Sequence, residues 1–340
     1  MTTMQALVMH AVGEPADVLR LETRPVPEPD AGQVRIRVQA APMHPTDLHI
    51  VRGRYGFSPE LPAVLGMECV GVVDALGDGV ETVAVGERVI TVGITGTWQQ
   101  YLVADAARVV AVPDQMSTST AAQLLTNPLT ALLLVTSKLD VQPGEWLLQT
   151  AAGSTVGRLV LQLGRHLGFK TINVVRRRAA VEEILELGGT EVICTEDEDL
   201  SRRVREIAGE DGVSKAIDSV AGQLGAEVFH SLAPGGEMIV YGALSTHRQT
   251  EADRLTLPLD ARSMIYGTKT VRGFWLYRWF TTTQQQQIDA ALAQTFNLVA
   301  DETIRIPEGQ PIPLPLFADA ARLAETPGHR GKPLLALADA

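Results

Sequence analysis

The amino-acid sequence predicts an α/β protein with two parts, a β-rich N-terminal domain and a doubly wound parallel sheet. In the first 120 residues, short strand-like runs alternate with Gly and Pro, which is typical of a small all-β domain. From about Thr118 onward, helical stretches alternate with strand-like ones, as in a parallel sheet with crossover helices. Within that part, residues 145–178 read as strand, Gly-containing turn, helix and strand, an arrangement that binds dinucleotides.

Gly and Pro punctuate the expected strands at short intervals. In the N-terminal part these strands are Gln5–Met9, Val34–Gln39, Cys69–Leu76, Arg88–Val92 and Ala107–Val112. In the parallel sheet they are Trp146–Gln149, Thr171–Val175, Glu191–Cys194, Ala216–Ser219, Met238–Tyr241 and Val271–Leu276. Two helices, Ile288–Leu298 and Phe317–Glu325, precede a last strand, Pro333–Leu337, which we expect to return to the N-terminal domain.

Bulk properties limit the classes of function. A chain of 340 residues with 45% hydrophobic content suits two domains. A net charge of −11 argues against a nucleic-acid or anionic-membrane surface. Two cysteines in separate segments, Cys69 and Cys194, predict no disulfide framework and a reducing compartment. The first residues enter a strand without a signal sequence, and no apolar run has membrane length, so we expect a cytoplasmic protein.

The turn after the first strand of the parallel sheet predicts a pyrophosphate site. It is a degraded G-x-G-x-x-G, with Ala151 at the first glycine position and Ser-Thr in place of the middle glycine. The following helix has an apolar stripe at spacings of three and four residues, which packs on a sheet. A helix N-terminus offers free N–H groups and a positive dipole end. The residues expected to bind the cofactor there are Gly153, Ser154, Thr155, Val156 and Gly157.

Three arginines, Arg176–Arg178, follow the second strand, where an NAD-type site carries Asp or Glu for the ribose 2′-hydroxyl. A guanidinium grips phosphate in a bidentate fork, so we expect Arg176 and Arg178 to hold the 2′-phosphate of NADPH. The alternative is a solvated cluster at the start of the next helix. Cations are unfavourable at a helix N-terminus without an anion, which favours the phosphate interpretation.

Several motifs resemble the medium-chain dehydrogenase/reductase superfamily, and the similarity covers essentially the whole chain. They are Gly66–Val73 (GMECVGVV), Gly86–Val89 (GERV) and Trp146–Gly157. Three further segments look most like the trans-2-enoyl thioester reductase and quinone oxidoreductase branch: Gly53–Val64, Thr171–Arg176 and Val271–Leu276. The resemblance implies a GroES-like catalytic domain at residues 1–120 and 278–340, and an NADPH-binding Rossmann domain at 121–277.

The motifs of the zinc-dependent members are altered in this chain. His44 stands where they place a cysteine ligand, and Met67 replaces the histidine of their Gly-His-Glu triplet. A Met thioether is a poor zinc ligand, and two cysteines cannot form a structural Cys₄ lobe. We therefore expect no metal, and read His44 and His49 as hydrogen-bonded loop histidines rather than a metal pair. His44 is also a departure from the Asn usual in this branch, and we place it in the substrate pocket.

Tyr55 is the candidate catalytic residue. Without a Lewis acid, a hydride donor beside hydrogen-bond donors suits conjugate reduction, in which negative charge appears on a carbonyl oxygen. A phenol with a pKa of about 10 stays protonated at neutral pH and can donate a hydrogen bond or a proton. The resemblance implies the same role, because the catalytic tyrosine of the enoyl reductases matches Tyr55. The alternative is an aromatic plug in a Gly-rich loop.

Further cofactor contacts are expected at the domain junction and at a strand end. By resemblance, Asn127 and Thr130 orient the carboxamide of the nicotinamide; the alternative is a helix cap for residues 129–134. A second group follows a strand at the edge where doubly wound sheets bind cofactors. Its members are Tyr241, Gly242, Ala243 and Leu244.

Two features suggest a substrate channel or a dimer contact. The resemblance suggests that Trp275 walls an acyl channel, and it is equally readable as an edge-strand aromatic at a dimer interface. The connection Ser245–Tyr266 is long for a structureless loop, so we expect it to be functional or dimer-forming.

Together these patterns predict an NADPH-dependent, zinc-independent reductase of an activated C=C bond. By resemblance, the substrate is a trans-2-enoyl thioester of CoA or acyl carrier protein. A quinone or α,β-unsaturated ketone reductase is the alternative enzyme, and a non-catalytic NADPH-binding protein is the alternative from another class. The family implies a homodimer, with a tetramer still open, and no nucleic acid or membrane partner is expected.

Overall fold

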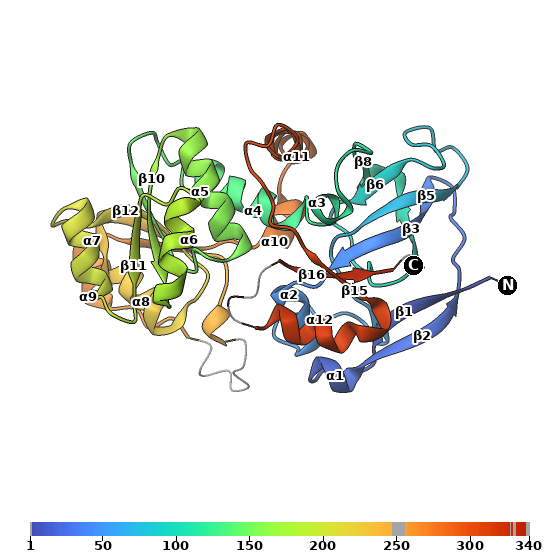
Figure 1. The fold of residues 1–340 in the computed structure, drawn as a ribbon, viewed down its shortest axis with the longest axis horizontal. Helices are drawn as coiled ribbons and strands as arrows, with labels where there is room; N and C mark the ends of the chain where they lie inside the picture. The colour runs from blue at the N-terminus through green and yellow to red at the C-terminus, as the bar shows by residue number, and fades with distance from the viewer. Residues whose placement is uncertain (1, 247–255, 327, 329–330, 338–340) are drawn as a thin grey trace. The chain divides into compact units, whose positions relative to one another are not determined.

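The computed structural model describes residues 2–246, 256–326, 328 and 331–337. The chain forms two compact units (Figure 1): unit 1 is Met1–Thr126 with Ile306–Ala340, and unit 2 is Asn127–Arg305. The boundaries between the units lie after residues 126 and 305, whereas the sequence predicted them after residues 120 and 277. The segment after 277, with α11 (Gln285–Ala300), belongs to unit 2.

Unit 1 is built on two sheets. The larger has seven strands in the order β15-β16-β3-β5-β6-β8, with β7 paired to β3 beside that path, and the smaller has the order β2-β1-β4. The strands are β1 (Thr3–Met9), β2 (Leu19–Pro25), β3 (Gln33–Pro42), β4 (Ala63–Val64), β5 (Val70–Leu76), β6 (Arg88–Thr91), β7 (Tyr101–Asp105), β8 (Val109–Ala111), β15 (Gln310–Pro313) and β16 (Pro333–Ala336). The α-helices are α1 (Pro15–Val18), α2 (Pro45–Val51), α3 (Thr118–Ala122) and α12 (Phe317–Ala324).

Strand β3 shows why the larger sheet forms. Its buried residues alternate with partly exposed ones, and Val34, Ile36 and Val38 are fully buried in the core of the unit. Alternation with period two places one face of a strand against a core. The chain returns to this strand at its end, since β16 pairs antiparallel with β3 and places Leu335 opposite Ala41. The expected return of the last strand is therefore confirmed.

Unit 2 contains a six-stranded sheet in the order β11-β10-β9-β12-β13-β14, and every pairing is parallel. Its strands are β9 (Trp146–Gln149), β10 (Lys170–Val175), β11 (Glu191–Cys194), β12 (Val213–Asp218), β13 (Leu232–Val240) and β14 (Thr270–Gly273). Its helices are α4 (Thr126–Leu133, which begins on the last residue of unit 1), α5 (Thr155–Leu167), α6 (Val181–Glu186), α7 (Leu200–Ala208), α8 (Gly222–His230), α9 (Ala261–Gly267), α10 (Leu276–Thr282) and α11. The expected doubly wound sheet is confirmed, and its order reverses between β9 and β12, where such sheets bind ligands at the carboxyl ends of the strands.

The structure differs from the expectations at a few elements. Strands β2, β4, β7 and β15 were not expected. The expected strand Val271–Leu276 ends at Gly273, and helix α10 begins at Leu276. Residues 247–255 of the long connection after Ser245 lie outside the described residues. No helix in the described part of the chain combines the length and hydropathy that a bilayer crossing needs.

Candidate active site

The turn between β9 and α5 has the geometry of a phosphate-binding loop. Ser154 caps the helix, because its Oγ accepts a hydrogen bond from the N–H of Gly157 at 3.1 Å. A Cβ on Gly157 would lie 2.6 Å from the carbonyl oxygen of Ala152, so only glycine allows this close packing of turn and helix. Ala151, at the degraded first-glycine position, has a φ of +48°, a conformation that glycine adopts more readily. The turn therefore keeps its backbone shape despite the altered motif.

The open side of this turn fits a phosphate group. A Cβ added to Gly153 would meet no atom within 4 Å, whereas the opposite side of the turn packs tightly at Gly157. Helix α5 runs for 13 residues from this point, so its first N–H groups and its dipole face the open side. Val156 is buried beneath the turn, and Thr155 is the first helical residue.

A buried amide supports the turn from the sheet below. The Nε2 of Gln149, on β9, donates to the carbonyl oxygen of Gly157 at 3.2 Å and to Oδ1 of Asn173 at 2.7 Å. Both amide side chains are fully buried. This pair was not predicted from the sequence, because its members lie on separate strands and neither belongs to the glycine motif.

Two hydroxyl groups at the carboxyl ends of β12 and β13 are buried and lack a hydrogen-bond partner in the described part of the chain. Tyr241 follows β13 and Ser219 follows β12, and neither Tyr241 Oη nor Ser219 Oγ completes a hydrogen bond with the described residues. Burial raises the pKa of Tyr241 to about 12, opposed by the nearby hydroxyls of Ser219 and Ser154. A buried polar atom is costly unless it is paired, so these hydroxyls fit a ligand bound beside the turn. The raised pKa keeps Tyr241 protonated, and therefore a donor, at any physiological pH.

The backbone of the expected group at residues 241–244 is fixed by the end of β12. Tyr241 donates its N–H to the carbonyl oxygen of Asp218 at 2.9 Å, and Leu244 donates to that of Ser219 at 2.8 Å. Gly242 packs against Ser219, where a Cβ would lie at 3.1 Å. The Asp218 carboxylate is buried and accepts a hydrogen bond from Thr150 Oγ1 at 2.6 Å. Leu244 is exposed, and Ala243 lies between it and Gly242.

The three arginines after β10 are all exposed, but the structure separates their roles. The Arg178 guanidinium binds Asp197, with Nε and Nη2 at 2.8 and 2.5 Å from Oδ2, and this contact raises its pKa. Its backbone N–H donates to Glu196. Arg176, among the described residues, makes no ion pair, which leaves its guanidinium available for an anion. Of the two arginines expected to contact a 2′-phosphate, Arg176 is therefore the one whose guanidinium is not held by a carboxylate among the described residues.

Asn127 and Thr130 lie in helix α4 rather than before it. Thr130 is buried, and the buried Nδ2 of Asn127 has no hydrogen-bond partner in the described part of the chain. The free amide donor is what a carboxamide-orienting residue requires. Trp275 occupies the N-cap position of α10 without a capping hydrogen bond from its side chain, and its ring lies tilted against Tyr277 with centroids 5.1 Å apart.

In unit 1, Tyr55 lies in the loop after α2, half-buried against the core and edge-to-face with Phe57 at 5.1 Å between centroids. The start of this loop is fixed by Arg52, which binds the carboxylates of Glu14 and Glu325. Gly53 then turns the chain with a φ of +66°. The anchored loop holds a phenol at a defined place.

The residues of unit 1 do not fit a zinc site. His44 is buried and its Nε2 lies 2.6 Å from Oε1 of Glu68, so the imidazole already has a partner. Burial raises the pKa of the Cys69 thiol to about 12, which disfavours the thiolate that binds metal. In the described part of the chain, no group of three or more His, Cys, Asp or Glu is arranged to hold a metal ion.

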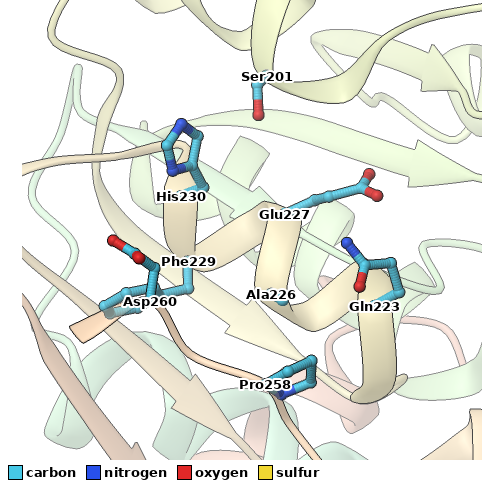
Figure 2. Close-up of a pocket in the computed structure, with 8 residues that line it drawn as sticks. All are labelled: Ser201, Gln223, Ala226, Glu227, Phe229, His230, Pro258 and Asp260. Carbon is cyan, nitrogen blue, oxygen red and sulfur yellow. The ribbon is translucent and has the colours of Figure 1, made fainter. Parts of the chain in front are cut away.

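A pocket of about 270 Å³ in unit 2 is separate from the residues expected to bind cofactor or substrate (Figure 2). Helix α8 provides most of its lining, together with Ser201, Pro258 and Asp260. Two of its side chains, Glu227 and Asp260, are carboxylates, which repel phosphate. It shares no residue with the expected cofactor or substrate groups.

A doubly wound sheet with a phosphate turn, joined to a β-rich unit that presents a phenol, defines a dinucleotide-dependent oxidoreductase. Residues 30–114 match the alcohol dehydrogenase GroES-like domain family, and residues 155–294 match the family described as zinc-binding dehydrogenase. The chain is 30% identical to the mitochondrial enoyl-[acyl-carrier-protein] reductase of Mus musculus, over 98% of this chain and 89% of the mouse protein.

Solved structures agree with these matches. A Bacillus thuringiensis protein with a proposed NADPH:quinone reductase activity superimposes with a TM-score of 0.91 at 30% identity, over 99% of both chains. A mycobacterial protein solved with NADPH superimposes with a TM-score of 0.86 at 27% identity, over 98% of this chain and 99% of that one. The chain belongs to the medium-chain dehydrogenase/reductase superfamily, in the branch of enoyl reductases and quinone oxidoreductases.

Proposed function

We propose that this protein is an NADPH-dependent, zinc-independent reductase of the C=C bond of a trans-2-enoyl thioester carried on CoA or acyl carrier protein. The similarity to the mouse enoyl-[acyl-carrier-protein] reductase, which spans 98% of this chain, carries the choice of substrate class. The cofactor choice is supported by the exposed arginines after β10 and by the NADPH complex of the mycobacterial relative.

The geometry of unit 2 supports the cofactor contacts that we propose. The open turn at Gly153 takes the pyrophosphate, and Arg176 takes the 2′-phosphate. The hydroxyls of Tyr241 and Ser219 and the amide of Asn127 are the buried groups that gain hydrogen-bond partners. When bound, NADPH supplies the hydride that C3 of the enoyl group accepts.

Tyr55 assists the second half of the reduction. As negative charge develops on the thioester oxygen, the phenol O–H donates a hydrogen bond to it. C2 then takes up a proton, either from the phenol or from water that the phenol orders, and the product is the saturated thioester. A phenol is an O–H donor at neutral pH.

The proposal is tested by following NADPH oxidation with crotonyl-CoA beside the same assay with 1,4-benzoquinone. We expect stoichiometric conversion of crotonyl-CoA to butyryl-CoA, with a much higher kcat/KM than for the quinone. The similarity to the B. thuringiensis protein keeps quinone reduction as a second candidate. Turnover of the quinone alone would replace the enoyl reductase proposal with that one, and turnover of neither by a protein that binds NADPH would favour a non-catalytic role.

We further propose that the protein is a homodimer formed through strand β14. Among the described residues this strand pairs only with β13, so its other edge offers unpaired backbone groups. Ile265 and Tyr266, on the preceding helix, are 66% and 81% exposed, which is unusual for large apolar side chains. Sedimentation equilibrium should give twice the 36.6 kDa mass of the chain. A monomer mass would contradict the proposal, and four times that mass would indicate a tetramer.

A further inference from the structure

Thr150, directly after β9, and Asp218, the last residue of β12, are joined by a buried hydrogen bond, and we call them the strand-end pair. Both side chains are fully buried, and Thr150 Oγ1 lies 2.6 Å from Oδ1 of Asp218. Since Thr150 Oγ1 also accepts the backbone N–H of Ser219 at 3.0 Å, its own proton is directed at the carboxylate. The order of the parallel sheet reverses between β9 and β12. The pair therefore joins the two strand ends at which sheets of this kind bind cofactors.

Asp218 also holds the loop that follows β12. Its Oδ1 accepts the N–H of Val220 at 3.0 Å, and its Oδ2 accepts the N–H of Ala221 at 2.9 Å. Helix α8 packs directly on this carboxylate, because a Cβ on Gly225 would lie 2.6 Å from Oδ2. The carboxylate thus accepts from three donors in an enclosed place, one at the end of β9 and two in its own loop.

Ala221 has a backbone conformation that requires such support. Its φ is +58° and its ψ is −156°, close to a region that glycine alone occupies readily. Strained backbone of this kind persists where the surrounding structure holds it, and it is common at ligand sites. The hydrogen bond to Asp218 is one such restraint, so its loss would allow the loop to relax to a more ordinary conformation.

The segments that the strand-end pair holds carry the groups expected to meet the cofactor. Ser219 is fixed through its N–H by Thr150, and its buried Oγ has no hydrogen-bond partner within the described chain. The carbonyl oxygen of Asp218 accepts the N–H of Tyr241, whose Oη is the other unpartnered hydroxyl. On the opposite side, Thr150 is followed at once by Ala151, where the phosphate-binding turn begins. The pair is therefore bonded to both sides of the expected site, and all of these residues belong to unit 2.

We infer that Thr150 and Asp218 are positioning residues for the dinucleotide: their hydrogen bond fixes the turn after β9, which takes the pyrophosphate, relative to the loop after β12, which carries Ser219 and supports Tyr241. This inference rests on the proposed function for the contacts of the turn and of the two hydroxyls. Neither residue of the pair touches cofactor or substrate in this account. Without the hydrogen bond, the two segments hold the binding geometry for a smaller fraction of the time, and the apparent affinity falls by that fraction.

The test measures NADPH and NADH binding by fluorescence titration, without substrate, for Asp218→Asn, Thr150→Val, Thr150→Ser and the double variant Thr150→Val/Asp218→Asn. Asparagine keeps the shape of Asp218, but its single amide oxygen cannot accept from all three donors, and valine removes the hydroxyl of Thr150. Each of these two changes should raise both dissociation constants about tenfold, because NADPH and NADH share the parts that meet these segments. Thr150→Ser keeps the hydroxyl and should stay within about threefold of wild type. Asp211→Asn, which changes an exposed aspartate before β12, is the matched control and should bind normally.

The double variant tests whether the two side chains act through one hydrogen bond. It should then be no more than about threefold weaker than the weaker single variant. A double variant about a hundredfold weaker than wild type would overturn the inference, because the two residues would act independently. If Thr150→Ser bound as weakly as Thr150→Val, the hydroxyl would not be the positioning group, and the inference would again be wrong.

A melting curve for each variant separates positioning from stability alone. Normal binding of both cofactors by Thr150→Val, with only a lower melting temperature, would overturn the inference. A loss of NADPH affinity that NADH does not share would do the same, since the 2′-phosphate contact would then be the one affected. If Asp218→Asn does not fold, Thr150→Val tests the same hydrogen bond from the other strand. These titrations use no substrate, so they remain decisive even if crotonyl-CoA is not reduced, whereas a wild type that bound neither cofactor would overturn the proposed function itself.

Discussion

Replacement of Tyr55 by Phe should lower kcat for crotonyl-CoA by about 100-fold or more, because a positioned proton donor contributes on the order of 10²–10⁴ in rate. The substitution removes one oxygen atom and keeps the ring that packs edge-to-face on Phe57, so the loop should retain its structure. KM for NADPH should not change, since the proposed role of Tyr55 is a hydrogen bond to the thioester oxygen and not a contact with the cofactor. Steady-state kinetics with both substrates varied would measure this.

Benzoquinone and a second tyrosine provide the controls. Reduction of a quinone needs no positioned proton donor, so the quinone rate of Tyr55→Phe should stay within about threefold of wild type. Tyr101→Phe, on strand β7 and outside every proposed contact with cofactor, substrate or partner subunit, should match wild type with either substrate. Equal losses with thioester and quinone would show that Tyr55 supports the structure of the site, and an unchanged thioester rate would remove it from the mechanism.

Replacement of Arg176 by Ala should raise KM for NADPH about 10- to 100-fold, since a hydrogen bond to a charged group contributes roughly 1.5–3 kcal/mol. KM for NADH should change little, because NADH lacks the 2′-phosphate. The ratio of the two kcat/KM values, measured with one substrate, reports this selectivity directly.

The structure predicts which arginine variants lose the most selectivity for NADPH. Arg178→Ala should cost less selectivity than Arg176→Ala, because Asp197 already holds the Arg178 guanidinium. Arg176→Ala with Arg178→Ala should lose the most, and Asp197→Asn, which releases Arg178, should not weaken NADPH binding. If the double variant affected NADPH and NADH equally, the arginines would have no role in 2′-phosphate recognition.

Where hydrophobic pattern and turn residues agree, the sequence predicted the elements closely. The strands Trp146–Gln149 and Glu191–Cys194 were predicted with the bounds that β9 and β11 have. Strand β15 was missed because two of its four residues are prolines, which usually argue against a strand. It is tolerated at the edge of the sheet, where it pairs only with β16 among the described strands. Tertiary pairing decided that element, not local propensity.

The residues of the candidate site also fall into a group that the sequence predicts and a group that it does not. The turn at Ala151–Gly157 and the arginines form contiguous motifs, so their placement could be read from the chain. The supporting residues could not, since the hydrogen bond from Thr150 to Asp218 joins positions 68 residues apart and that from Leu125 to Glu68 joins positions 57 apart. Such pairs leave no periodic signal. The ion pair of Arg178 was missed for the same reason.

The pairing of β16 with β3 has a consequence for biosynthesis. In Figure 1 the red strand β16 lies beside the blue strand β3, within the larger sheet of unit 1. All six strands of the parallel sheet of unit 2 are complete once residue 273 has been made, whereas the sheet of unit 1 waits for residues 333–336. During translation, β3 therefore leaves the ribosome before any strand of unit 2, and it lacks one neighbour until β16 follows. The larger sheet of unit 1 is begun before the parallel sheet of unit 2 and is finished after it.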